Sequence, residues 1–197
     1  GVGVMGIKQR RRREKEQRRR QILDAARALL FKKGLNAISI NQIARRAELA
    51  VGTIYFYFRS KEEIFAALQE EGLTLLHEEV RSALPPEADP ADRLHAMAQA
   101  YLRFSREHKN YFDVINYFLS ATDVMFTPEI KQQIDEHGKR ILMVVQEALQ
   151  DGVAQGRFGA IDARRHALLF WGILHGLIPF QKMQDTLLAD DAFPALY

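Results

Sequence analysis

The chain has 197 residues and 47% hydrophobic side chains, which suffices for a folded core, and its formal net charge is +3. It has no cysteine, which excludes disulfides and thiolate zinc sites and makes a reducing cytoplasm the expected compartment. The longest uncharged run, residues 167–181, is shorter than the roughly 20 residues of a membrane-spanning helix, so no membrane partner is expected.

Charge is strongly segregated along the chain. Residues 1–61 carry 16 Lys and Arg against four Asp and Glu, a net charge of +12, whereas the remainder carries a net charge of −9. A basic head on an acidic body is typical of a polyanion-binding module joined to a domain that does not bind polyanions. The alternative is a basic tail that only adds solubility.

The first 61 residues contain the pattern of three helices. Apolar side chains recur with helical spacing between residues 17 and 33, and Gly34 is placed to end that helix. Ser39 is expected to cap a second, short helix, and the four residues 48–51 separate it from a third that carries Ile54 and Tyr55. Two short helices joined in this way behind a longer one predict a helix-turn-helix.

Residues 60–197 contain the pattern of longer helices. One is expected from Ser60 to about residue 84, where the proline-rich stretch 85–90 ends it. Helical spacing resumes over residues 94–105, and an aromatic-rich segment, 111–126, follows. Further helices are expected from Pro128 to about residue 155 and from Asp162 to residue 183. Since no β-alternation of useful length is present, the predicted class is all-α.

Residues 40–44 (INQIA) and 52–63 (GTIYFYFRSKEE) together resemble the tetracycline-repressor (TetR) family of bacterial regulators. The resemblance covers residues 17–65 well, and beyond them it is limited to the number and length of helices. It implies a three-helix head with a helix-turn-helix plus a larger helical ligand-binding and dimerisation domain. The expected domains are a basic N-terminal arm at 1–16, a DNA-binding domain at 17–61 and a ligand-binding and dimerisation domain at 62–197.

The resemblance implies that the third helix enters the major groove of double-stranded DNA. The expected DNA-binding residues are Ser39, Asn41, Val51, Gly52, Thr53, Tyr55, Tyr57 and Lys61.

Each of these residue types suits a particular contact. Gly52 lets the backbone approach DNA closely, and methyl groups of Val51 and Thr53 suit thymine methyls. The two tyrosines and the lysine suit phosphates, and the Asn41 amide suits adenine. Two alternatives stay open: the Tyr55 ring packs in the core of the head, or Asn41 is a solvated surface amide.

Three features qualify this interpretation. Glu48 stands where the family usually has glycine, so a left-handed backbone is expected at a non-glycine residue. Ala50 replaces the usual capping serine. The arginines at 10–13 and 18–20 are expected to enter a narrow minor groove or to clamp phosphates, and the alternative is a flexible solubilising tail.

Aromatic residues are frequent in the segment that follows the proline-rich stretch, and the resemblance implies a small-molecule effector of unknown identity. The residues expected to bind a small apolar or amphipathic ligand are Met97, Tyr101, Phe104, Phe112, Asn116, Phe118, Trp171 and His175. The alternative is that these side chains are plain core. No cofactor or metal is expected.

The last helix is apolar nearly all round from residue 167 to residue 180, so it needs covering on more than one side. Gly172 and Gly176 would allow close approach of another helix. Together with residues 130–154, this helix is expected to form a homodimer interface, which in turn predicts a near-palindromic operator. Burial within the monomer is the alternative.

Enzymatic motifs are missing from the sequence. No serine stands in a nucleophile-elbow context, the six histidines lack metal-site spacing, and no glycine-rich phosphate loop is present. The expected function is therefore that of a ligand-responsive, sequence-specific transcriptional regulator, a repressor released from its operator by an effector, and not that of an enzyme. The alternative is an architectural DNA-binding protein without an effector.

Overall fold

A computed structural model describes residues 2–84, 87–120 and 127–183. The described residues form helices and no strand, which confirms the all-α prediction. In chain order the elements are α1 (Val2–Lys33), η1 (Leu35–Ala37), α2 (Ile40–Arg46), α3 (Val51–Tyr57), α4 (Lys61–Ser82), α5 (Pro90–Glu107), α6 (Lys109–Ser120), α7 (Pro128–Ala154), α8 (Ala163–Leu177) and η2 (Ile178–Met183).

The predicted helix boundaries follow from local backbone chemistry. Gly34 has a φ of 74°, and its N–H donates to the carbonyl of Leu30 at 2.9 Å, as expected for a left-handed cap. The Ser60 hydroxyl accepts a hydrogen bond from the N–H of Glu63 at 3.3 Å, and Asp162 caps α8 in the same way. These three predicted caps are confirmed.

Two boundaries differ from the sequence-based expectation. The first helix begins at Val2 rather than near residue 17, because the basic segment is rich in good helix formers and makes helical i,i+4 pairs such as Arg10–Glu14 at 3.1 Å. The last α-helix ends at Leu177, and residues 178–183 form a 3-10 segment. Pro179 lacks the N–H that would continue the α-helical bonding. Residues 121–126 of the expected aromatic segment lie outside the described residues.

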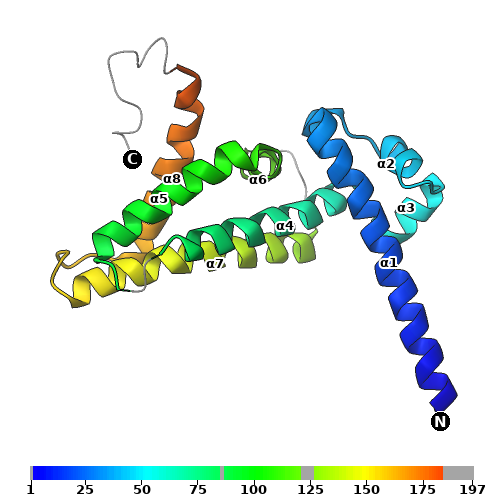
Figure 1. The fold of residues 1–197 in the computed structure, drawn as a ribbon, viewed down its shortest axis with the longest axis horizontal. Helices are drawn as coiled ribbons and strands as arrows, with labels where there is room; N and C mark the ends of the chain where they lie inside the picture. The colour runs from blue at the N-terminus through cyan, green and yellow to red at the C-terminus, as the bar shows by residue number, and fades with distance from the viewer. Residues whose placement is uncertain (1, 85–86, 121–126, 184–197) are drawn as a thin grey trace.

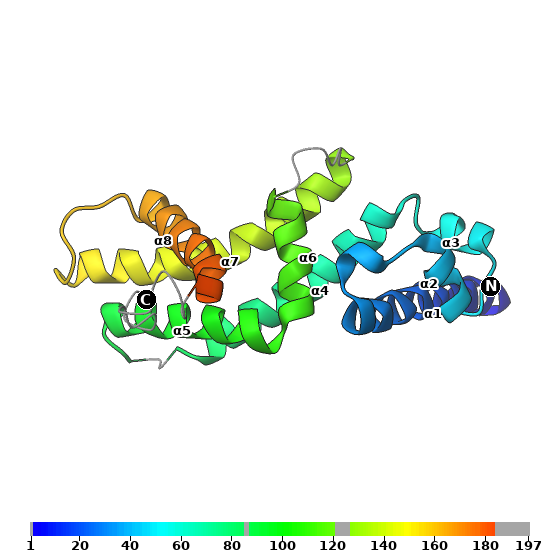
Figure 2. The same ribbon diagram turned by 90° about the horizontal axis from the view of Figure 1, so that it is seen from above.

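The helices form a head and a body that α4 connects (Figure 1). The head consists of α1, α2 and α3, and the N-terminal part of α1 projects past it. The body contains α5, α7 and α8. The α7 helix runs alongside α4, and both views show α5 and α8 away from the head (Figures 1 and 2). The α6 helix contacts both α4 and α5. It therefore lies between the head and the part of the body that is expected to bind the ligand.

Two separate clusters of buried side chains hold these parts together. The head core includes Ile22, Ile54 and Phe58, which are fully buried, and α4 contributes Phe65 to it. The body core combines side chains from α4 to α8, among them the fully buried Phe104. Because α4 contributes to both cores, a displacement of α4 changes the position of the head relative to the body.

The packing of the body core predicts that Gly152 in α7 does not tolerate a larger side chain. An alanine Cβ there would collide with the ring of Phe158, which packs against the body core. We expect Gly152→Ala to lower the free energy of unfolding by about 1–3 kcal/mol, since overpacking forces the ring aside. Gly138→Ala in the same helix meets nothing within 4 Å and should raise that free energy by about 0.5–1 kcal/mol. Urea unfolding measures both, and equal shifts in the two variants would contradict the prediction.

Candidate functional site

The turn between α2 and α3 sets the orientation of the expected recognition helix. Glu48 has a φ of 55°, which confirms the left-handed backbone expected at this non-glycine position. The N–H of Leu49 donates to the carbonyl of Ala44 at 2.9 Å, which closes the turn. Gln21 on α1 donates its side-chain N–H to the carbonyl of Ala47 at 2.7 Å and ties the same turn to the first helix. These two hydrogen bonds hold the turn in one conformation despite the strained backbone of Glu48.

The α3 helix buries one face and leaves the other open. Ile54 is fully buried in the head core, and Phe58, which directly follows the helix, is buried beside it. Val51, Gly52 and Tyr55 are exposed, and a Cβ at Gly52 would meet nothing within 4 Å. The Tyr55 side chain is 52% exposed, so its ring lies outside the head core. An open face of this kind is accessible to a DNA groove.

The remaining expected DNA-binding residues border this open face to different degrees. Thr53 is half-buried, and Tyr57 packs partly against the head core with its ring in edge contact with that of Phe56. Lys61 is half-buried, with its Nζ 5.3 Å from the ring centroid of Phe65. Its ammonium therefore lies at the start of α4, next to the recognition helix.

Ser39 and Asn41 have different roles at the start of α2. The Ser39 hydroxyl accepts from the N–H of Gln42 at 3.3 Å, and the Gln42 side chain accepts from the N–H of Ser39 at 3.2 Å. This reciprocal capping box confirms the predicted cap and occupies one acceptor site of the hydroxyl. The side chain of Asn41 is exposed. Contact of either residue with DNA stays a prediction.

The basic segment is part of a helix that is anchored to the head. Arg19 places its guanidinium 4.2 Å from the ring centroid of Phe58 and donates to the carbonyl of Tyr57 at 3.4 Å. Arg10 and Arg12 are exposed and pair with glutamates one turn away. The arm is therefore a helical extension with part of its positive charge offset along the helix.

Four of the residues expected to bind a ligand meet in the body. The Tyr101 hydroxyl lies 2.8 Å from Nδ1 of His175. The Tyr101 ring is in edge contact with those of Trp171 and Phe112, at centroid distances of 4.8 and 5.9 Å. Burial lowers the pKa of His175, so its imidazole is neutral at pH 7. Tyr101, Phe112, Trp171 and His175, termed the aromatic cluster, thus form an apolar, uncharged group with few polar atoms.

The other four expected ligand-binding residues lie around this cluster or away from it. Met97 and Phe104 are fully buried in the same body core, and Phe104 packs against His108. Asn116 is half-buried one turn beyond Phe112 on α6. Phe118 belongs to the head core instead, where it contacts Tyr117. The spacing along α6 turns it toward the head, so the structure does not bring it together with the aromatic cluster.

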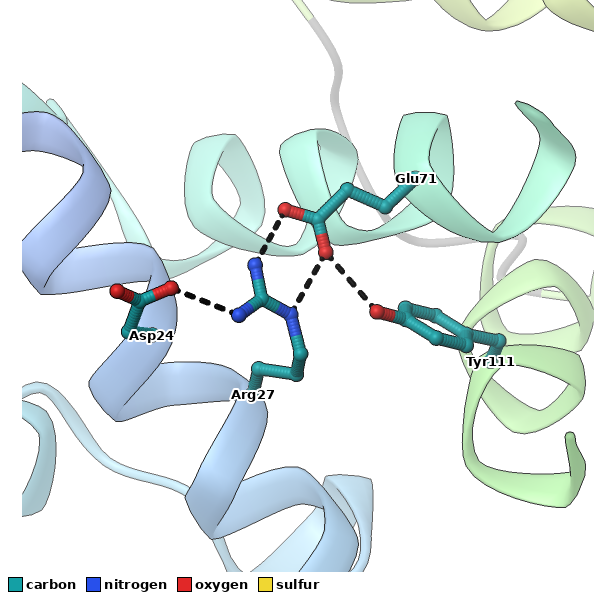
Figure 3. A network of polar contacts seen from close by, with 4 residues as sticks. All are labelled: Asp24, Arg27, Glu71 and Tyr111. Carbon is teal, nitrogen blue, oxygen red and sulfur yellow. Dashed lines mark hydrogen bonds and ion pairs between the residues drawn. The ribbon is translucent and has the colours of Figure 1, made fainter. Parts of the chain in front are cut away.

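A polar network joins the head to the body where α1, α4 and α6 meet (Figure 3). Arg27 on α1 donates two hydrogen bonds to the Glu71 carboxylate on α4, at 2.9 and 2.7 Å, and a third to Asp24 at 2.7 Å. Tyr111 on α6 donates its hydroxyl to the same carboxylate at 3.0 Å. Burial and the nearby carboxylate raise the pKa of Tyr111, so the phenol keeps its proton. Bidentate, charge-assisted bonds of this kind fix geometry as well as distance.

One face of α8 is left open in the single chain. Leu168, Leu169 and Ile173 are exposed, and a Cβ at Gly172 or Gly176 would meet nothing within 4 Å. Ala167 and Leu174 on the opposite face are buried in the body core. The alternative that the whole helix is buried within the monomer does not hold for the open face.

Comparison with known proteins identifies the family. A pattern described as "Bacterial regulatory proteins, tetR family" matches residues 22–68, and another described as "Tetracyclin repressor-like, C-terminal domain" matches residues 94–192. The chain belongs to the TetR family. It is a ligand-responsive, DNA-binding transcriptional regulator and not an enzyme.

Relatives of this TetR-family chain include a fatty acid metabolism regulator protein from Bacillus subtilis, 25% identical over 166 residues that cover 84% of each chain. The solved structure of the TetR-family regulator PfmR from Thermus thermophilus is 26% identical, with a TM-score of 0.62 over 81% of this chain and 85% of that one. The structure of Bacillus subtilis FadR in complex with stearoyl-CoA has the same fold, with 24% identity and a TM-score of 0.68 over 89% and 91% of the two chains.

The TetR-family head contains features that sequence reasoning overlooked. Phe56 is 76% exposed on the open face of α3, beside the residues expected to contact DNA. In the sequence it stands within an aromatic run, and only its helical position relative to Ile54 indicates an exposed side chain. The Arg27–Glu71–Tyr111 network was also missed, because its members are 40 or more positions apart. No signal in a single sequence pairs them.

Two absences hold for the part of the chain that the structure describes. No helix there is long and apolar enough to cross a membrane. Within residues 2–84, 87–120 and 127–183, no three His, Asp or Glu side chains gather as a metal site would require.

Substitutions in the head test the assignment of phosphate contacts. We expect Tyr55→Ala and Lys61→Ala to weaken binding to all DNA sequences alike, and to reduce the slope of log affinity against log salt by about one unit for the lysine. Fluorescence anisotropy across a salt series measures both quantities. The matched control is Lys109→Ala, an exposed lysine on α6. Unchanged affinity and slope in both head variants, with folding intact, would contradict the assignment.

Proposed function

We propose that this protein is a repressor that binds a near-palindromic operator as a homodimer in the cytoplasm and is released when a small amphipathic effector binds at the aromatic cluster. The observation that carries the DNA-binding part is the open face of α3. Val51, Gly52, Tyr55 and Phe56 are exposed there while Ile54 anchors the helix in the head core. The net charge of +12 over residues 1–61 supports the same partner.

The open face of α8 supports the homodimer. Exposed leucines and an isoleucine alternate there with two glycines, which suits close packing of two helices from different copies. Met143 on α7 is exposed as well, and α7 packs along α8. A two-fold interface made by these helices places two α3 helices at a fixed separation, and a palindromic site follows from that symmetry.

The aromatic cluster supports the effector site, because it gathers apolar rings and a few polar atoms within the body. The names of the relatives point to an effector with an acyl chain: one relative regulates fatty acid metabolism, and the FadR structure contains stearoyl-CoA. Such a molecule is amphipathic, which agrees with the effector proposed above.

Phe112 connects the aromatic cluster to the contacts between the head and α4. It lies in the cluster, and its neighbour on α6, Tyr111, holds the Glu71–Arg27 pair. The Tyr111 ring also packs on Phe31 of α1 at a centroid distance of 5.5 Å. An effector that moves Phe112 therefore displaces the contact that fixes α1 against α4. Coupling between two sites of this kind is commonly worth about 1–3 kcal/mol, or 5- to 150-fold in affinity.

A binding selection tests the proposed function. The full-length protein is incubated with fragmented genomic DNA, bound fragments are sequenced, and the affinity for the recovered site is compared with that for a shuffled version of it. We expect a near-palindrome that binds about 10³-fold or more tightly than shuffled DNA, and release when stearoyl-CoA is added. Uniform affinity for all fragments would instead indicate an architectural DNA-binding protein.

A further inference from the structure

The indole N–H of Trp171 is a buried hydrogen-bond donor without an acceptor among the described residues. Buried donors in folded proteins are nearly always paired, because an unpaired one has lost its hydrogen bonds to water and gained none. The N–H therefore stands out within a body whose other described buried side-chain polar atoms have partners.

The surroundings of this donor define what can satisfy it. The hydroxyl of Tyr101 and Nδ1 of His175 are already bonded to each other. The Trp171 ring is in edge contact with that of Tyr101, at a centroid distance of 4.8 Å, and with that of Phe170, at 5.7 Å. The four side chains of the aromatic cluster carry no charge at neutral pH, so they offer a carboxylate no cation. A neutral acceptor oxygen attached to an apolar chain matches both the donor and its surroundings.

We propose that the Trp171 indole N–H is the specificity-determining donor of the effector site, and that the effector presents to it a neutral carbonyl oxygen carried on an apolar chain. The inference rests on the proposed function, since it assigns the polar contact within the same effector site. It selects ketones, esters, amides and thioesters over hydrocarbons, which lack the acceptor, and over free carboxylates, which would bury an unpaired charge.

The chain offers a direct probe, because Trp171 is its single tryptophan. In the full-length protein labelled with ¹⁵N, one indole resonance reports this N–H alone. The ligands are the octanoyl thioester of N-acetylcysteamine, the matched octyl thioether in which a methylene replaces the carbonyl, and octanoate. We expect the thioester to shift the indole proton downfield and the thioether to leave it near its free position, because only the thioester supplies the acceptor.

Calorimetry on variants gives the energetic counterpart. Wild-type protein should bind the thioester about 5- to 10-fold more tightly than the thioether, which is the usual gain from one neutral hydrogen bond. Trp171→Phe keeps an aromatic ring but removes the N–H, so the two affinities should converge to within about 2-fold. Phe170→Leu, which removes the neighbouring ring and leaves the N–H, should keep the discrimination. A thermal melt confirms that each variant is folded.

Equal affinity of the wild-type protein for thioester and thioether, or an indole resonance that the thioester does not move, would overturn the proposal. Tighter binding of octanoate than of the thioester would overturn it too. Selective binding to the recovered operator, measured in the same buffer, distinguishes this outcome from failure of the proposed function. If the protein still binds the operator selectively but does not prefer the thioester, the proposed function as a regulator is retained and only the role assigned to Trp171 is wrong.

Discussion

Ile173→Glu is expected to convert the protein to a monomer and to lower its affinity for the operator by roughly 100-fold or more. The Ile173 side chain is 60% exposed in the single chain, so a glutamate there meets water and leaves the monomer folded. In a two-fold interface of α7 and α8 helices, the same carboxylate would be buried against apolar surface without a partner. Each monomer then presents one α3 helix, and the gain from binding two half-sites together is lost.

Size-exclusion chromatography with light scattering gives the oligomeric state, and fluorescence anisotropy gives the operator affinity. The matched control is Leu119→Glu on α6, because Leu119 is apolar like Ile173 and similarly exposed, at 65%. It should leave both properties unchanged. A wild-type protein that is monomeric at micromolar concentration would remove the dimer, the palindrome and the proposed switch together. An Ile173→Glu dimer with normal affinity would place the interface elsewhere.

Glu71→Gln is expected to lower the free energy of unfolding by about 1–3 kcal/mol and to weaken operator binding by roughly 10-fold. The substitution preserves the shape of the side chain but leaves Arg27 half-buried without the carboxylate that accepts two of its hydrogen bonds. It also removes the charged acceptor of Tyr111. The head is then no longer held at one angle to α4 and α6, so two heads match the spacing of the operator less often.

Denaturant unfolding and anisotropy measure these effects, and Arg27→Met with the double variant completes a thermodynamic cycle. We expect a coupling energy of about 1–3 kcal/mol between Arg27 and Glu71, because their bidentate contact is partly shielded from water. The control is Lys109→Gln, which breaks an exposed i,i+4 pair with Asp113 and should change stability by less than about 0.5 kcal/mol. Equal effects of the Glu71 and Lys109 substitutions would contradict a special role for the network.

The sequence by itself determined the local features of this protein. Ser39, Ser60 and Asp162 cap helices because their side-chain oxygens accept from N–H groups three residues further along the chain, and such bonds depend on neighbours alone. The left-handed backbone at Gly34 and Glu48 follows from turns of a few residues. The motif over residues 40–63 is equally local, and it was enough to predict the family, the helix-turn-helix and the exposed Gly52.

Only the tertiary structure decided what distant residues do together. The sequence shows only that Phe112 and Phe118 are apolar residues on one predicted helical segment. In the structure, Phe112 lies in the aromatic cluster and Phe118 in the head core, because α6 packs against both. The bond between Tyr101 and His175 spans 74 positions, and that between Arg27 and Glu71 spans 44. Such pairs depend on how α1, α4, α5, α6 and α8 pack, which no periodicity encodes. The sequence therefore predicted which kinds of residue form the site, whereas the packing of the whole chain determined which residues contact one another.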